Sequence, residues 1–281
     1  MLRVAIPNKG QLAEPAKEML REAGYLQNSS LEKLVIHDPV NDAEFFFLRP
    51  KDVATYVGSG KLDVGITGRD MLLDSQAEAD ELLELGFGGS TFRLAAPIGS
   101  ASSIKDLEGK RVACSYPTLL KKWLDEHNIN AKIVKLDGAV ENAVALGVAD
   151  WVADVVATGT TLRQAGLEVI GEPILKSESI VIRRHGAEAN VAVETFIRRL
   201  QGVMVARAYV LVDYDIKNSD LPGAIKLTPG IESPTISSLA DPAWSAVRAM
   251  VPKSEVHAVM DSLYEMGARG ILVTDIHACR L

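Results

Sequence analysis

Residues 147–163 read Gly-Val-Ala-Asp-Trp-Val-Ala-Asp-Val-Val-Ala-Thr-Gly-Thr-Thr-Leu-Arg, and this stretch indicates the class of fold. The apolar run Trp151–Val156 has the length and β-branched content of a buried strand. It contains one carboxylate, Asp154, and leads into Ala157-Thr158-Gly159-Thr160-Thr161 and a helix start at Leu162. A strand, a tight glycine turn and a helix in this order predict a ligand-binding loop on an α/β scaffold.

The residue types of this loop suit a phosphate group. Backbone N–H groups at a helix start face an anion, and Gly159 lets the backbone approach the anion closely. The threonine hydroxyls add donors, and Asp154 is placed to hold ribose hydroxyls or a phosphate-bound Mg²⁺. A strand, turn and helix with a capping threonine and a solvated aspartate would give the same pattern, so the residues alone leave both interpretations open.

The loop resembles the one that binds 5-phosphoribosyl-1-pyrophosphate (PRPP) in phosphoribosyltransferases. Together with Leu136–Glu141, the opening Leu2–Gly10 and the turn Thr67–Asp70, it makes the whole chain resemble the ATP phosphoribosyltransferase family in its long, self-regulated form. This family catalyses the first step of histidine biosynthesis. The resemblance implies an α/β fold with a two-lobed core like that of periplasmic binding proteins and a C-terminal regulatory domain.

Composition bounds the domain count and the class of protein. A chain of 281 residues is too long for one typical core, and 47% hydrophobic with 24% charged residues is typical of globular proteins. The net charge of −7 argues against a nucleic-acid partner, and two distant cysteines cannot form a disulfide framework. The chain opens directly on a strand without a leader, and no run is long enough to span a membrane. We therefore expect a soluble cytoplasmic protein without a membrane partner.

The first lobe is predicted from three apolar runs and the helical patterns between them. Strands are expected at Leu2–Ile6, Glu44–Leu48 and Asp63–Ile66, helices at Gln11–Ala23, Pro50–Val57 and from Met71, and a loop or hairpin at residues 28–43. Lys9 and Arg49 each follow one of these strands, at the edge where open α/β sheets bind ligands. Either could be an exposed turn residue, but two basic groups at one edge favour an anion site.

A second lobe repeats this plan. Strands are expected at residues 92–98, 111–115, 132–135 and 151–156, with helices at 118–127 and 139–146. Ile66–Asp70 and Ala157–Thr161 each follow an apolar strand and open a helix, so the two lobes should present equivalent loops across a cleft. The strand Ser179–Ile182 should cross back to the first lobe. The expected division is 1–92 with a return segment of about 182–202 for lobe I, and 93–181 for lobe II.

The remaining residues, 203–281, read as a compact module after a linker near Gln201-Gly202. Strands at 208–214, 235–239, 244–251 and 270–274 and helices at 221–227 and 254–266 give the order βαββαβ, which is ferredoxin-like. Without the resemblance, this module could equally be a dimerisation or structural domain, because fold does not fix function.

The resemblance implies a reaction in which N1 of ATP attacks C1 of PRPP and displaces Mg²⁺-pyrophosphate, giving N1-(5-phosphoribosyl)-ATP. It assigns Ala157, Thr158, Gly159, Thr160 and Thr161 to the 5-phosphate, and Asp154 with Glu141 to the ribose hydroxyls, directly or through Mg²⁺. Lys9 and Arg49 would take the pyrophosphate or triphosphate, and Lys9, Arg49 and Asp154 are the expected catalytic residues.

The adenine side of the site is assigned to Asp70, Met71 and Tyr116. A carboxylate can accept from an amino group and a tyrosine ring can stack on a base, although Tyr116 could equally be a packing aromatic. Taken alone, Glu141 is a residue type common on helix surfaces. The only expected metal is Mg²⁺ brought by the substrate, because no histidine or cysteine spacing suits zinc.

The resemblance also implies feedback inhibition by L-histidine at the C-terminal module, with Asp215, Thr235 and Gly270 as binding residues, and a homo-oligomer, dimer to hexamer. Two other functions keep the same architecture. One is a bilobed solute-binding or sensor protein, and the other is a phosphoribosyltransferase that uses a different base.

Overall fold

The computed structural model describes residues 1–27, 33–156 and 159–280. By their contacts these residues form two compact units, Met1–Arg21 with Tyr25–Ile197, and Glu22–Gly24 with Arg198–Leu281. The first unit holds two sheets and the second holds one. Within the described residues, none of the helices combines the length and the apolar character that crossing a membrane requires.

Lobe I is built on a six-stranded sheet of order β2-β3-β1-β4-β11-β5. Its elements are β1 Leu2–Pro7, α1 Ala13–Glu22, β2 Val35–Asp38, β3 Ala43–Leu48, α2 Pro50–Gly58, β4 Val64–Gly68, α3 Arg69–Ser75, β5 Ala79–Glu84 and β11 Ser179–Arg184. Strands β3, β1 and β4 are parallel, and β11 runs antiparallel to both of its neighbours. The carboxyl ends of β1 and β4 therefore meet at one edge of the sheet, as expected for a ligand site.

Lobe II is built on a five-stranded sheet of order β10-β6-β9-β7-β8. Its elements are β6 Ser90–Pro97, η1 Ile104–Leu107, β7 Arg111–Cys114, α4 Pro117–Glu126, β8 Lys132–Lys135, η2 Val140–Ala143, β9 Trp151–Val156, α5 Thr160–Gln164 and β10 Leu167–Ser177. Buried side chains lie on both faces of this sheet, with Val112 and Trp151 in one cluster and Ala113 and Val152 in the other. Trp151, Val152 and Ala153 of β9 are buried on both faces of the sheet, which explains the apolar start of this strand.

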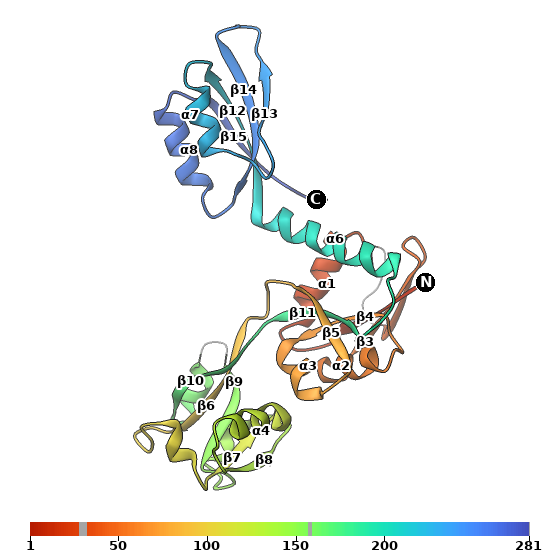
Figure 1. The fold of residues 1–281 in the computed structure, drawn as a ribbon, viewed down its shortest axis with the longest axis vertical. Coiled ribbons are helices and arrows are strands. Elements are labelled where there is room, and N and C mark those ends of the chain that lie inside the picture. The colour runs from red at the N-terminus through yellow and green to blue at the C-terminus, as the bar shows by residue number, and fades with distance from the viewer. Residues whose placement is uncertain (28–32, 157–158, 281) are drawn as a thin grey trace. The chain divides into compact units, whose positions relative to one another are not determined.

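The chain passes between the lobes twice, from β5 to β6 and from β10 to β11 (Figure 1). The two crossings are joined by backbone hydrogen bonds, from Leu85 N–H to the Ser179 carbonyl at 2.9 Å and from Ser179 N–H to the Phe87 carbonyl at 2.9 Å. Strand β11 then pairs with β4 and β5, which confirms the predicted return to the first lobe. The two-lobed α/β core is the predicted fold.

The C-terminal unit is a four-stranded antiparallel sheet of order β13-β14-β12-β15. Its elements are β12 Tyr209–Lys217, α7 Leu221–Leu227, β13 Thr235–Ser238, β14 Trp244–Pro252, α8 Val256–Glu265 and β15 Arg269–Asp275. Helices α7 and α8 cover one face (Figure 1), and residues from both join the core below that face. The element order and strand order confirm the ferredoxin-like prediction.

Four local predictions differ from the structure. The helix expected at 139–146 is the short 3₁₀ turn Val140–Ala143, because Ala139 adopts a left-handed backbone with φ of 49° just before it. Helix α3 begins at Arg69 rather than at Met71, which puts Asp70 in its first turn. Strand β5 was not predicted, because its sequence Ala-Asp-Glu-Leu-Leu-Glu lacks a clean apolar alternation.

The fourth difference is the expected linker near Gln201-Gly202. Helix α6, Val191–Ala208, continues through it for 18 residues in all. A Cβ at Gly202 would lie 2.1 Å from the Cys279 carbonyl oxygen, so the glycine is required by close packing against the C-terminal segment. A glycine inside the helix therefore marks a contact rather than an end of the helix.

Candidate functional site

A cleft between the two lobes collects residues at the carboxyl ends of strands from both sheets. It encloses about 230 Å³ and is lined by Lys9, Gly10, Gln11, Leu12, Pro50, Gly68, Asp70, Met71, Gly88, Ser90, Tyr116, Val155 and Ser177. Four residues predicted from sequence are therefore together here: Lys9, Asp70, Met71 and Tyr116. The cleft lies where β1 and β4 end, the edge at which open α/β sheets place their ligands.

Asp70 is the most completely bonded carboxylate of the cleft. It is 4% exposed, and its Oδ1 accepts hydrogen bonds from the Ser177 hydroxyl and the Met71 N–H, both at 2.9 Å. Its own N–H donates to Ser177 Oγ at 3.1 Å. A Cβ at Gly68 would lie 2.3 Å from Asp70 Oδ1, so glycine is required for the carboxylate to fold back over the helix start.

Tyr116 is packed between the lobes. It is 6% exposed, contacts the Phe92 ring edge-to-face at 5.7 Å, and its N–H donates to Cys114 Sγ at 3.1 Å. The Lys51 ammonium lies 5.0 Å from the ring centroid. Burial and the neighbouring Asp70 raise the pKa of the Tyr116 hydroxyl, which stays protonated at neutral pH. Tyr116 is thus a packed aromatic in this conformation, and stacking on a base stays a prediction.

Asp154 is half-buried at the end of β9 and poorly bonded. Its Oδ1 accepts from the adjacent Val155 N–H at 2.8 Å, and no lysine or arginine within the described residues forms an ion pair with it. The pKa of the carboxyl is raised to about 6, mainly by burial and also by Glu141, while the Val155 N–H and Lys51 oppose the rise. A carboxylate in this state gains from a cation or from hydroxyl donors, which a ligand can supply.

The predicted phosphate loop follows Asp154 directly. Ala157 and Thr158 lie outside the described residues, so the predictions for them stay untested. Gly159 has a φ of +74°, a left-handed backbone that favours glycine, and it caps the five-residue helix α5. Thr160 and Thr161 are exposed on the first turn of α5. Because α5 is so short, any anion there would be held by local N–H and hydroxyl groups rather than by a long helix dipole.

The other predicted anion and metal residues lie around the cleft. Lys9 is exposed and lines it, whereas Arg49 is exposed at the N-cap of α2 and is not among the lining residues. Glu141 is half-buried in η2, close enough to Asp154 to raise its pKa. No group of three or more His, Cys, Asp or Glu suited to a metal occurs within the described residues. Asp154 and Glu141 are carboxylates, the ligand type that Mg²⁺ takes together with substrate phosphates, and a magnesium site here stays a prediction.

Sequence reasoning missed two residues at the lobe boundary. The Lys51 ammonium in the first lobe donates a hydrogen bond to the Ser115 carbonyl in the second lobe at 3.0 Å. Asp74 Oδ1 accepts from the N–H groups of Thr118 at 2.9 Å and Leu119 at 3.1 Å. Lys51 has a sequence signal, because it stands next to Arg49 and Pro50 at a strand end. Asp74 has none, because its partners are 44 and 45 residues away.

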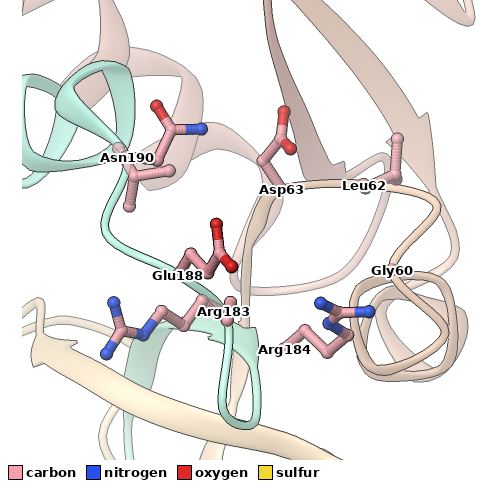
Figure 2. Close-up of a pocket in the computed structure, with 9 residues that line it drawn as sticks. Gly60, Leu62, Asp63, Arg183, Arg184, Glu188 and Asn190 are labelled. Carbon is pink, nitrogen blue, oxygen red and sulfur yellow. The ribbon is translucent and has the colours of Figure 1, made fainter.

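A second hollow of about 190 Å³ lies at the opposite end of β4 and β11 (Figure 2). Figure 2 shows the Arg183 and Arg184 guanidinium groups on opposite sides of it, with Asp63 and Glu188 nearby. It contains none of the predicted site residues and lies away from the carboxyl ends of the parallel strands. The interlobe cleft is therefore the candidate active site.

The three predicted effector residues lie on three strands of the C-terminal sheet. Asp215 on β12 and Gly270 on β15 are neighbours, because a Cβ at Gly270 would lie 3.6 Å from Asp215 Oδ2. Thr235 is exposed on β13, and β14 separates it from β12. All three belong to the sheet face opposite the buried Val212 and Tyr214.

Known proteins resemble the chain along its whole length. A family model described as ATP phosphoribosyltransferase matches residues 49–202, and one described as HisG, C-terminal domain, matches residues 206–278. The ATP phosphoribosyltransferases of Arthrobacter sp. (strain FB24) and Streptomyces coelicolor are 60% identical over 286 residues and 58% identical over 285, with 100% of both chains covered in each case. A solved ATP phosphoribosyl transferase (HisG:HisZ) complex from Thermotoga maritima matches with a TM-score of 0.65 and 28% identity, over 73% of this chain and 98% of that chain.

Proposed function

The chain belongs to the ATP phosphoribosyltransferase family, whose reaction is the first step of histidine biosynthesis, and we propose the course of that reaction in this cleft. N1 of ATP attacks C1 of PRPP, the bond from C1 to the pyrophosphate oxygen breaks, and N1-(5-phosphoribosyl)-ATP forms. No proton has to leave N1 for this bond to form. Catalysis is then mainly alignment of the two substrates and stabilisation of charge.

The state of Asp154 is the observation that carries the proposal. As pyrophosphate leaves, C1 and the ring oxygen gain positive charge, and a carboxylate nearby stabilises that charge. Asp154 is half-buried, and burial raises its pKa to about 6 although its Oδ1 accepts from the Val155 N–H. Ribose hydroxyls would supply donors that the protein does not, so bound PRPP would hold Asp154 ionised at neutral pH.

The phosphate groups of both substrates require basic residues or backbone donors. Gly159, Thr160 and Thr161 would hold the 5-phosphate, together with Ala157 and Thr158. Lys9, which lines the cleft, and Arg49 would take the pyrophosphate or the triphosphate. A Mg²⁺ carried by PRPP would neutralise the leaving pyrophosphate, with Asp154 and Glu141 as its protein ligands.

The adenine would occupy the side of the cleft formed by Asp70, Met71 and Tyr116. Asp70 Oδ1 already accepts two hydrogen bonds, so an adenine amino group would have to use the carboxylate's remaining acceptor capacity. This makes Asp70 an orienting residue for the base rather than an acid or base in the reaction.

Regulation and assembly are part of the same proposal. L-histidine would inhibit by binding at Asp215, Thr235 and Gly270 in the domain 203–281, and would favour one arrangement of the chain over another. The chain would act as a homo-oligomer, dimer to hexamer, and in the cytoplasm, where ATP and PRPP are available.

Incubation of the full chain with ATP, PRPP and Mg²⁺ tests the reaction. We expect one pyrophosphate released for each N1-(5-phosphoribosyl)-ATP, followed by absorbance and mass spectrometry, and no product when PRPP or Mg²⁺ is omitted. Product with another purine but not with ATP would replace the assignment with a different phosphoribosyltransferase. Tight binding of ATP or PRPP without product would favour a solute-binding or sensor role.

A further inference from the structure

Helix α4 of the second lobe begins without a cap of its own. Pro117 at its first position has no N–H, and the N-cap residue Tyr116 makes no side-chain capping bond. The free donors of the first turn are the N–H groups of Thr118 and Leu119. Both donate to Asp74 Oδ1, at 2.9 and 3.1 Å, and Asp74 lies on α3 of the first lobe. One lobe therefore caps a helix of the other.

A second contact reaches the same segment. Lys51 on α2 donates to the Ser115 carbonyl at 3.0 Å and covers the Tyr116 ring. Residues 115–119 thus make three hydrogen bonds with two side chains of the first lobe, and they carry Tyr116 into the cleft. These contacts are separate from the two chain crossings near residues 85 and 178, so they can break while the lobes stay connected.

We propose that Asp74 is a positioning residue that holds the two lobes at the separation required to bind both substrates. The proposal rests on the proposed function, because it assumes that ATP and PRPP bridge the cleft. Two-lobed proteins open and close about their crossings, and a contact made in only one arrangement shifts the equilibrium towards it. Loss of that contact lowers the fraction of competent protein, which weakens the apparent binding of both substrates together.

Three full-length variants separate positioning from general stability. Asp74→Ala leaves the Thr118 and Leu119 N–H groups without their acceptor, whereas Asp74→Asn keeps a carbonyl oxygen that can accept both. Asp106→Ala is the matched control, because Asp106 Oδ2 accepts from the Ser102 and Ser103 N–H groups at 2.8 and 3.0 Å inside lobe II. Both alanine variants remove a carboxylate that accepts two backbone donors, but only one of these carboxylates joins the lobes.

Steady-state kinetics give the first readout. For Asp74→Ala we expect the KM values for ATP and PRPP to rise together, about five- to tenfold, with kcat within about twofold. Asp74→Asn should restore both KM values to within about threefold of the parent chain. Asp106→Ala should lower Tm by a similar amount and leave both KM values unchanged. Unchanged KM values in Asp74→Ala, or equal rises in both alanine variants, would overturn the proposal.

A distance measurement on the substrate-free chain tests the junction even if the proposed reaction fails. Spin labels at Tyr56→Cys on α2 and Lys122→Cys on α4, in a Cys279→Ser background diluted with unlabelled chain, report the lobe separation; both positions are exposed. Asp74→Ala should broaden and lengthen the distance distribution, and Asp106→Ala should leave it as in the parent. An identical distribution in all three would show that Asp74 does not hold the lobes.

Discussion

Asp70 lines the interlobe cleft, and Asp154 on β9 precedes the lining residue Val155, but the fold gives these two carboxylates different surroundings. Asp70 is 4% exposed and accepts from the Ser177 hydroxyl and the Met71 N–H, so its burial is compensated. Asp154 is less buried than Asp70, and its Oδ1 accepts from the N–H of the adjacent Val155. Its pKa is nevertheless raised to about 6. The comparison indicates that a carboxylate whose burial is not compensated by hydrogen bonds is the one available to a ligand.

The largest expected effect comes from Asp154→Asn. The amide keeps the shape but loses the charge that stabilises the developing cation, so kcat/KM should fall about 10²- to 10³-fold in the ATP and PRPP assay. The folded state should not be weakened at neutral pH, which urea unfolding would check. Turnover close to that of the parent chain would remove Asp154 from the mechanism and end the contrast with Asp70.

Asp70→Ala should act mainly on stability. It leaves the Ser177 hydroxyl and the Met71 N–H without their buried acceptor, which should lower the free energy of unfolding by about 2–3 kcal/mol. Urea unfolding at constant m-value measures the loss, and Ser177→Ala, expected to cost about 1 kcal/mol, is the matched partner. If Asp70→Ala unfolds like the parent chain, its hydrogen bonds do not support the cleft.

The pH dependence of stability tests the raised pKa of Asp154. Because the pKa of Asp154 is about 6 in the folded state and 3.8 for an unperturbed aspartate, the folded state binds one more proton than the unfolded state between about pH 4 and 6. The contribution of Asp154 to the free energy of unfolding therefore falls by about 2–3 kcal/mol as pH rises through that window, and it stays lower at higher pH. The Asp154→Asn variant should therefore be more stable than the parent chain by that amount at pH 7.5 and equally stable at pH 4. Equal differences at both pH values would contradict the raised pKa.

The smallest of the expected effects is that of Thr161→Ala, which removes an exposed hydroxyl at the start of α5. We expect about a tenfold loss of kcat/KM for PRPP, the size of one lost hydrogen bond to a charged group, with unfolding unchanged. Initial rates at varied PRPP and fixed ATP measure it. Normal kinetics would mean that the threonines of this loop do not contact the sugar phosphate.

The apolar runs predicted most of the fold. Strand β9 matches its predicted bounds because it is buried on both faces, and the alternation of β12 gives the inner face of the ferredoxin-like sheet. Local periodicity could not predict η2, because the left-handed backbone of Ala139 precedes it. It also could not predict the full length of α6, because Gly202 lies inside the helix where the C-terminal segment packs closely against it. A contact distant in sequence decides the case of α6, whereas the local backbone of Ala139 decides that of η2.

Sequence alone could predict only those site residues that have a reactive or polar side chain and directly follow a strand. Lys9, Asp70 and Tyr116 follow strands, and the structure brings all three to the cleft. Lys51 has a local signal, because it stands next to Arg49 at a strand end, but its partner is 64 residues away. Asp74 has no local signal, because its partners are 44 and 45 residues away, so its role follows from tertiary structure alone.

A crystal structure of the chain with PRPP and Mg²⁺ tests the central claim most directly. We predict density for the sugar with its ribose hydroxyls or its metal within hydrogen-bonding or coordination distance of Asp154, and its 5-phosphate against residues 157–161. Well-defined PRPP elsewhere, with these residues free of ligand, would contradict the account.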